Sequence, residues 1–376
     1  MNKPEGSCRS AGINTVTEAI QSSCALQPRC LSPRFDNSQP ELLAPSGSIK
    51  TLTAAVQAGA DAVYLGAGKF SARAFAANFD DSELTSAIKY AATANVKVYL
   101  AVNTLMTDRE LAEALDIVGQ AYDAGAAAFI VQDLGLASMI KRQHPGAVLH
   151  ASTQMTAATL KDVNALGSLG FRRVVLAREL SREQIREIAA NTTVELEVFV
   201  HGALCSSYSG QCLISSFIGG RSANRGKCAQ PCRLPYKSAS KSGVLLSLKD
   251  LCLVDYVGEL AEMGVTSLKI EGRMKGEDYV RAVVGAYRAV LDGNPLSEKQ
   301  KKSMLGVFDR GGYTDGYYTG IGAGMYMETL RNPYAAAPRV ASDACRNKAQ
   351  FKMHGTGLAP TSHRQRRSAK GGNNAD

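Results

Sequence analysis

Eight short apolar stretches recur along residues 41–292 and alternate with segments whose apolar positions follow a helical period. Apolar stretches without polar alternation are typical of strands buried on both faces, as in a parallel sheet covered by helices. Eight such units over about 250 residues predict an α/β fold, a TIM-like (β/α)8 barrel. The apolar stretches cover 41–46, 62–66, 97–102, 128–132, 148–153, 173–178, 196–201 and 267–271, and the clearest helical segments cover 107–124, 156–168, 181–190 and 251–263.

Two possible helix starts support this alternation. Residues 81–84 read Asp-Ser-Glu-Leu and residues 181–184 read Ser-Arg-Glu-Gln, which resemble capped first turns. The main alternative is an open, doubly wound sheet, in which Gly66 and Gly68 would form a nucleotide-binding turn after the second strand. Ser71 stands where that motif needs its third glycine, so the motif is weak.

The expected barrel covers residues 40–295 and contains a cysteine-rich loop, 203–240, inserted after the seventh strand. A helical and loop extension, 296–338, follows the barrel. Residues 1–39 do not match the barrel pattern and are expected to be a disordered or non-native extension. Residues 339–376 hold eight Lys or Arg and two Asp without apolar periodicity, which predicts a disordered basic tail.

The composition is that of a globular chain, since 45% of the 376 residues are hydrophobic. No apolar stretch approaches the ~20 residues that a bilayer-spanning helix requires. The first 39 residues also lack the basic start and apolar centre of a secretory signal. We therefore expect a cytoplasmic protein without a membrane partner. Disulfides are rare in that reducing compartment, which favours metal binding by clustered thiols.

Four cysteines, Cys205, Cys212, Cys228 and Cys232, fall within 28 residues. Their spacings are C-x6-C, C-x15-C and C-x3-C, so neither end carries the C-x2-C pair of a common structural zinc site. This pattern favours an iron–sulfur cluster of the 4Fe-4S type, which Cys thiolates also bind. Zinc is the alternative cofactor, and two disulfides or four unrelated thiols remain open.

Cations gather in the same part of the chain. Residues 205–241 contain six Lys or Arg and no acidic residue, whereas the whole chain carries a net charge of +9. These cations could offset the negative charge of a thiolate-bound cluster, or they could bind phosphates. Tyr208, Phe217 and Tyr236 lie among them and could stack on bases, although core packing is the commoner use of aromatic residues. The predicted RNA contacts are Arg221, Arg225, Lys227, Arg233 and Tyr236.

Polar residues near the ends of the expected strands are the candidate catalytic groups, because TIM barrels carry their sites at the carboxyl ends of strands. In the last strand the apolar side chains should face the helices, which leaves Lys269, Glu271 and Arg273 on the inner face or rim. A buried ion-pair network that only orders the core is the competing interpretation. By the same alternation Glu197, Phe199 and His201 share a face, as do His150, Ser152 and Gln154, while Asn103, Asp133, Arg178 and Glu179 follow other strands.

Several long motifs carry a family resemblance. They are Glu-Val-Phe-Val-His-Gly-Ala-Leu-Cys-Ser-Ser-Tyr-Ser-Gly-Gln-Cys-Leu-Ile-Ser at 197–215, Asn-Arg-Gly-Lys-Cys-Ala-Gln-Pro-Cys-Arg at 224–233, Ser-Leu-Lys-Asp at 247–250 and Lys-Ile-Glu-Gly-Arg at 269–273. Together they closely resemble peptidase family U32, the collagenase-like peptidases, over residues 41–320.

The resemblance implies a function. Better-understood relatives hold an iron–sulfur cluster with the four-cysteine set and hydroxylate RNA, at the wobble uridine of tRNA or at a cytidine of large-subunit rRNA. Cys205, Cys212, Cys228 and Cys232 are then the cluster ligands. An electron donor or hydroxyl-group donor of unknown identity is a further implied partner. The predicted catalytic residues are Glu271, Arg273, Lys269, Asp250, His201 and Glu179.

Two other functions stay open. Some family members are labelled collagenases or proteases, so a peptidase, a hydrolase, is the main alternative. The chain has no His-Glu-x-x-His zinc motif and no Gly-x-Ser-x-Gly elbow, so a cysteine nucleophile would have to come from the four-cysteine set. A catalytically silent RNA-binding protein is the third possibility. Cys252 is expected on an amphipathic helix as a core thiol, and Cys8, Cys24, Cys30 and Cys345 are assigned no role.

Overall fold

The computed structural model describes residues 39–72, 79–308, 310–322 and 324–327. The expected N-terminal extension, apart from Gln39, and the expected basic tail lie outside the described residues. Within the described part of the chain, none of the helices combines the length and apolar character that a bilayer span needs.

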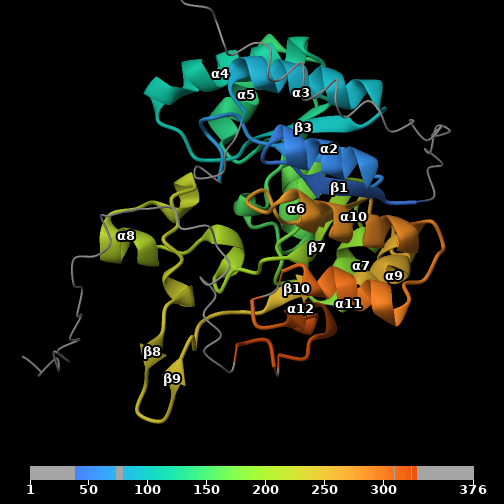
Figure 1. The fold of residues 1–376 in the computed structure, drawn as a ribbon. Coiled ribbons are helices and arrows are strands. Elements are labelled where there is room, and N and C mark those ends of the chain that lie inside the picture. Colours follow the sequence, from blue (N-terminus) through green and yellow to red (C-terminus); the bar gives the residue numbers. More distant parts are fainter. Residues whose placement is uncertain (1–38, 73–78, 309, 323, 328–376) are drawn as a thin grey trace, which may run out of the picture. The chain divides into compact units, whose positions relative to one another are not determined.

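Eight parallel strands form a closed barrel (Figure 1). The chain order of the strands is also their order around the barrel, and the eighth strand, β11, closes the ring by pairing with both β1 and β7. The predicted TIM-like barrel is confirmed, because each predicted apolar stretch contains or overlaps one of these strands. The strands are β1 (Glu41–Pro45), β2 (Ala62–Leu65), β3 (Lys97–Val102), β4 (Ala128–Val131), β5 (Leu149–Ala151), β6 (Arg173–Val175), β7 (Glu195–Gly202) and β11 (Ser267–Ile270).

Helices connect successive strands, as the alternation of apolar patterns predicts. Ser181 caps α7 as expected, and Gln184 completes the capping box. The other predicted helix start, at 81–84, is capped one residue earlier, by Asp80, whose side chain accepts from Glu83 N. The helices are α2 (Ile49–Gln57), α3 (Asp81–Thr93), α4 (Asp108–Asp123), α5 (Leu134–Gln143), α6 (Leu160–Ser168), α7 (Arg182–Ala190), α9 (Val257–Glu262), α10 (Glu277–Leu291) and α11 (Glu298–Gly306).

Alternation along the strands separates two apolar cores. Leu42 and Ala44 belong to the large core shared with the helices, whereas Leu43 between them belongs to a small core inside the barrel. Tyr64 and Tyr99 are the largest side chains of the inner core. Polar and charged side chains occupy the remaining length of the lumen, so the inside of this barrel is filled by two chemically different layers.

The segment between β7 and β11 contains the cysteine-rich insert and a strand that the sequence pattern missed. Residues 250–252 form β10, which pairs antiparallel with β7 through Leu251–Gly202 and Cys252–His201. The predicted helix over 251–263 is therefore wrong in its first half, and Cys252 lies on a strand. The other elements here are α8 (Ile214–Gly219), β8 (Tyr236–Lys237), β9 (Ser242–Gly243) and the 3-10 turns Tyr208–Gly210, Ala223–Arg225, Pro231–Arg233 and Val254–Tyr256.

The extension after the barrel packs on the same region. Its strand β12 (Tyr313–Thr314) pairs parallel with β10, and Met327 N donates to Ser247 O. A short helix, α12 (Gly316–Thr319), follows. A further 3-10 turn, Thr153–Met155, ends β5. The extension therefore supports the insert at the carboxyl ends of the strands.

Candidate functional site

A cavity of about 240 Å³ lies at the carboxyl ends of the barrel strands. The insert and the strand ends both contribute to its wall, which places the four thiols opposite the polar residues of the lumen. The side chains that matter for chemistry are Cys205, Cys212, Cys228 and Cys232 from the insert and Asn103, Ser152, Gln154, Arg178, Lys269, Glu271, Arg273 and Lys275 from the barrel. The structure thus brings together residues that are up to 172 positions apart in the printed sequence, from Asn103 to Lys275.

The first half of the cysteine loop is fixed to the end of β6. Glu179 accepts hydrogen bonds from Ser209 N and Ser209 Oγ, both at 2.9 Å. Arg178 Nη1 donates to Ala203 O at 2.7 Å. Ser209 is fully buried and has φ of 27°, a conformation that a non-glycine residue keeps only when its surroundings hold it. Glu179, a predicted catalytic residue, therefore positions the loop, and its side chain is outside the cavity wall.

The thiols are free and receive donors from the insert itself. Cys212 Sγ accepts from Ile214 N at 3.4 Å, and Cys228 Sγ accepts from Gln230 N at 3.3 Å and from Ser215 Oγ at 3.9 Å. Burial raises the pKa of the Cys232 thiol. Among the described residues, no three His, Cys, Asp or Glu side chains converge closely enough for a single metal ion.

Cys252 lies apart from this thiol set. Its thiol is mostly buried beside Tyr287, and burial raises its pKa. It packs against the large core and is outside the cavity wall. The expectation that Cys252 is a core thiol therefore agrees with its position, although the strand rather than a helix carries it.

Lys269 is paired inside the barrel. Its Nζ donates to Glu197 Oε1 at 2.6 Å and lies over the Tyr64 ring at 4.5 Å. Burial lowers the pKa of Lys269, and the Glu197 carboxylate opposes that shift. Both predicted inner-face positions are confirmed, but the pair also fits the competing interpretation, an ion pair that orders the lumen.

Glu271, Arg273 and Lys275 form the rim of the cavity where β11 ends. Arg273 is buried and its Nη1 donates to Ser71 Oγ at 2.5 Å. A side chain at Gly47 would place its Cβ 2.0 Å from Arg273 O, so the chain passes Arg273 too closely for any other residue. Loss of solvent lowers the pKa of Lys275 to about 7, and Arg310 adds to the shift.

His201 faces away from the cavity, contrary to the prediction that it shares the inner face with Glu197 and Phe199. The β7–β11 pairing shifts register after Lys269–Phe199, so that Ile270 pairs with His201. This bulge breaks the alternation and turns His201 toward α10, where Nδ1 lies 3.4 Å from Tyr287 Oη. Burial lowers the pKa of His201 to about 3.

Asp250 is buried at the start of β10 and also lies outside the cavity wall. Arg310 Nη1 lies 3.4 Å from Asp250 Oδ1, and Arg310 itself lines the cavity. The structure therefore places Asp250 behind a cavity-lining cation. Sequence reasoning missed Arg310, because it belongs to the extension and carries no strand-end signal. Lys275 continues the alternation of Lys269, Glu271 and Arg273, so that pattern could have found it.

The predicted RNA contacts divide into buried and accessible groups. Arg233 is only 6% exposed, and it donates to Leu204 O at 3.1 Å and to Ser247 Oγ at 3.0 Å, so it lies in the cavity wall rather than on the outer surface of the insert. Arg225 forms an ion pair with Glu110 of α4. Arg221 Nε donates to Lys227 O at 3.1 Å, Tyr236 Oη donates to Pro231 O at 2.8 Å, and the Lys227 side chain is exposed.

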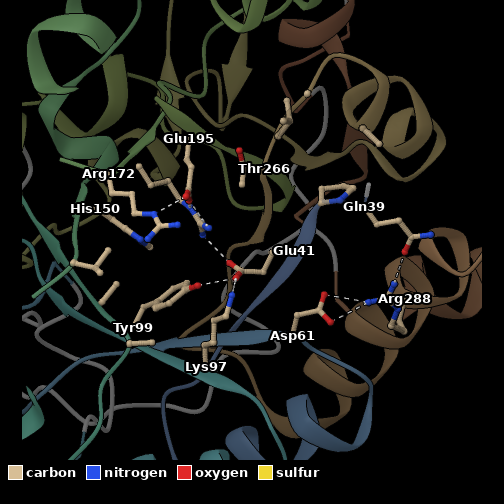
Figure 2. A pocket seen from close by; sticks show the side chains of 18 of the residues that line it. Gln39, Glu41, Asp61, Lys97, Tyr99, His150, Arg172, Glu195, Thr266 and Arg288 are labelled. Carbon is tan, nitrogen blue, oxygen red and sulfur yellow. Dashed lines mark hydrogen bonds and ion pairs between the residues drawn. The ribbon is translucent and has the colours of Figure 1, made fainter. Parts of the chain in front are cut away.

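A second cavity, of about 850 Å³, lies at the opposite end of the barrel (Figure 2). Arg173 Nη1 lies 2.6 Å from Glu41 Oε1, and Tyr99 Oη donates to Glu41 Oε2 at 2.7 Å. Arg288 Nη1 lies 3.1 Å from Asp61 Oδ2. His150 is buried with a lowered pKa, for which burial is the main cause and Arg173 the next. The charges in this cavity pair with one another within the described residues.

The model of peptidase family U32 matches residues 47–326, which is most of the chain. The chain belongs to peptidase family U32. That assignment agrees with the motifs at 197–215, 224–233 and 269–273, which surround the cavity at the carboxyl ends of the strands.

Relatives of this U32 chain carry different names. A 23S rRNA 5-hydroxycytidine synthase of Escherichia coli is 41% identical over 259 residues, which cover 67% of this chain and 39% of that protein. The tRNA hydroxylation protein P1 of Bacillus subtilis is 37% identical over 272 residues, which cover 69% of this chain and 64% of that protein. A collagenase of Porphyromonas gingivalis is 34% identical over 308 residues, which cover 74% of this chain and 73% of that protein.

Proposed function

We propose that this U32 protein is an RNA base hydroxylase that uses an iron–sulfur cluster held by Cys205, Cys212, Cys228 and Cys232. The observation that carries the proposal is that all four thiols and the inner-face cations of the last strand line one cavity. Two relatives named for rRNA and tRNA hydroxylation support RNA as the substrate. The target base is then a wobble uridine of tRNA or a cytidine of large-subunit rRNA.

Four cysteine thiols at one cavity wall are a donor set that a 4Fe-4S cluster uses, and zinc is the alternative occupant. Backbone N–H groups directed at Cys212 and Cys228 would stabilise cluster-bound thiolates. A bound 4Fe-4S cluster would supply one-electron transfer next to the substrate.

The chain's own residues would bind and orient the base. A base that leaves its stack needs a closed pocket with polar groups at its edge, and the cavity of about 240 Å³ offers Asn103, Gln154 and Arg273. Lys275, with its pKa lowered to about 7, exists in both protonation states near neutral pH. It would therefore exchange a proton with a base placed at the rim.

The decisive experiment compares Cys228→Ala with Cys252→Ala, because the second cysteine lies outside the cavity. Anaerobically purified wild-type protein should contain about four irons and four sulfides per chain. The purified Cys228→Ala protein should lack the iron, and RNA from cells that carry this variant should lack one hydroxylated nucleoside. The Cys252→Ala protein should keep its iron, and the RNA of its cells should keep the nucleoside. Unchanged nucleosides in Cys228→Ala cells, or stoichiometric zinc in the wild-type protein, would contradict the proposal.

The peptidase alternative rests on the name of the family and on relatives that are named a collagenase and a protease. A cysteine nucleophile needs a neighbouring base, and the described residues of the cavity wall include no histidine. His201 and His150 are buried elsewhere in the barrel. Turnover of a peptide library that a single cysteine substitution abolishes would favour this alternative.

A further inference from the structure

The outer face of α8 exposes apolar side chains next to two of the four thiols. Phe217 is 86% exposed and Ile218 is 52% exposed. Ser215, on the opposite face of the same helix, is fully buried and donates to Cys228 Sγ. The helix therefore separates the thiols from an apolar surface, and such a surface on a folded chain usually marks an interaction site.

The insert that carries this apolar surface also contains cations, some of which are paired or buried and some of which are exposed. Arg225 is paired with Glu110 and Arg233 is buried. The exposed lysines are Lys227, whose carbonyl accepts from Arg221 just after α8, and Lys237 and Lys241, which lie on the β8–β9 hairpin. Because residues 205–241 contain no Asp or Glu, the surface attracts a negatively charged partner rather than a neutral one.

An exposed aromatic ring in a basic segment is typical of proteins that bind single-stranded nucleic acid. The ring stacks on an unpaired base of any kind, and the cations follow the phosphates. Phe217 is the most exposed large apolar side chain of the described residues. A paired duplex would hide the base faces that this ring could contact, so an unpaired strand fits the surface better than a helix.

The position of the surface relates it to the cavity. The segment that follows α8 contributes Ala223, Gly226 and Cys228 to the cavity wall. Figure 1 shows α8 and the β8–β9 hairpin extending from the strands of the barrel. A strand that stacks on α8 would therefore lie next to the cavity, where one of its nucleotides could enter.

We propose that α8 and Lys227 form a landing surface for single-stranded RNA, on which the Phe217 ring stacks against an unpaired base beside the target nucleotide. This inference rests on the proposed function, because it supplies the RNA that the hydroxylase would act on. An acidic protein is the other partner that a basic apolar surface could bind. The exposed aromatic ring and the shared cavity wall favour RNA.

The test is the affinity of the full chain for a fluorescent twelve-nucleotide polyuridine, measured by anisotropy at several salt concentrations. Phe217→Ala should weaken binding about 5- to 100-fold, since stacking contributes ~1–3 kcal/mol per base, and should leave the salt dependence unchanged. Phe217→Leu, which keeps an apolar side chain without the ring, should weaken binding to a similar extent. Lys227→Gln should instead reduce the slope of log K against log salt by about 0.7.

Leu169→Ala is the matched control. Leu169 is 57% exposed, follows α6 and lies at the opposite end of the barrel strands, so its substitution should not change RNA binding. Phe217 is exposed, so its variants should keep the wild-type melting temperature and iron content. Equal polyuridine affinity of the wild-type, Phe217→Ala and Leu169→Ala proteins would overturn the proposal.

Two results separate this inference from the proposed function. If Phe217→Ala binds RNA normally but loses RNA hydroxylation in cells, α8 binds another partner, such as an acidic protein, and the landing surface is wrong. If polyuridine binding depends on Phe217 but no nucleoside depends on Cys228, the landing surface stands and the hydroxylase proposal fails.

Discussion

The two ends of this barrel carry cavities that differ in the balance of charged side chains. The cavity of about 850 Å³ lies at the amino ends of the strands (the N-terminal cavity), and its wall contains four Lys or Arg and four Asp or Glu. The cavity of about 240 Å³ lies at their carboxyl ends (the C-terminal cavity), and its wall contains six Lys or Arg and one Glu. At the first end the cations have carboxylate partners from neighbouring strands. At the second end, Lys269 and Arg310 pair with carboxylates that lie behind the wall, Glu197 and Asp250, and the wall itself carries thiols and Glu271. Charge balance thus distinguishes the end that stabilises the barrel from the end suited to thiolates and phosphates.

Glu197 connects the two ends through the middle of the lumen. Its Oε1 accepts from Lys269 Nζ, which borders the C-terminal cavity, and its Oε2 lies 3.5 Å from Arg173 Nη1 at the N-terminal end. The side chain is fully buried. A chain of buried ion pairs therefore runs through the lumen from Glu41 and Arg173 to Lys269 at the second cavity.

The largest effect should follow from removing Glu197. Glu197→Ala leaves Lys269 and Arg173 buried without their shared partner, which should lower the free energy of unfolding by about 3–5 kcal/mol. Urea unfolding followed by circular dichroism measures this loss. In a Lys269→Met background the same substitution should cost less, because one uncompensated cation has been removed. A loss under 1 kcal/mol in the single variant would show that the network contributes little.

Lys275 should give the C-terminal end a pH-dependent stability. Its pKa is about 7 in the folded chain, against an ordinary value of 10.5, so the unfolded chain binds the extra proton between these values. Stability should therefore rise with pH from about 7 and level off above 10.5, by at most ~1.4 kcal/mol per pH unit. Lys275→Met should remove that slope when unfolding is measured from pH 7 to 9. A slope that persists in the variant would assign it to another group.

Glu179 tests whether the cysteine loop depends on its anchor. Glu179→Ala leaves Ser209 N without its acceptor, at a cost of about 1–3 kcal/mol, and the loop from Cys205 to Cys212 should loosen. We expect faster loss of iron from the purified protein during exposure to air, measured by absorption. Glu183→Ala, on the exposed first turn of α7, is the control and should behave as the wild type. Equal rates in both variants would mean that the loop holds its geometry without Glu179.

Sequence periodicity predicted the barrel because local patterns determine it. Each strand is a short apolar stretch, and alternation alone placed Lys269 and Glu197 inside the lumen, where they pair. The family motifs pointed to the four cysteines, which do line one cavity. These features depend on neighbours in sequence, and they could therefore be read without the fold.

The errors have a common physical cause, since each depends on pairing between distant segments. The β7–β11 bulge turned His201 outward, and the pairing of β10 with β7 replaced half of a predicted helix. Arg233 was predicted as an RNA contact from its charge, whereas hydrogen bonds to the carbonyl groups of Leu204 and Leu248 hold it in the cavity wall. Glu179 and Asp250 act through Ser209 and Arg310, and no local pattern shows such indirect roles.

The smallest expected change in stability comes from Arg172, which can be compared with Arg173 at the same end of the barrel. Arg172 and Arg173 are neighbours, and both are paired with Glu195, but the Arg172 side chain is 67% exposed and the Arg173 side chain is 6% exposed. Arg172→Ala should change the free energy of unfolding by less than about 0.5 kcal/mol, because solvent screens an exposed pair. Arg173→Ala should cost several kcal/mol, since Glu41 and Glu197 lose a buried partner. Similar costs for the two variants, measured in one urea series, would show that burial of the charge has little effect on stability.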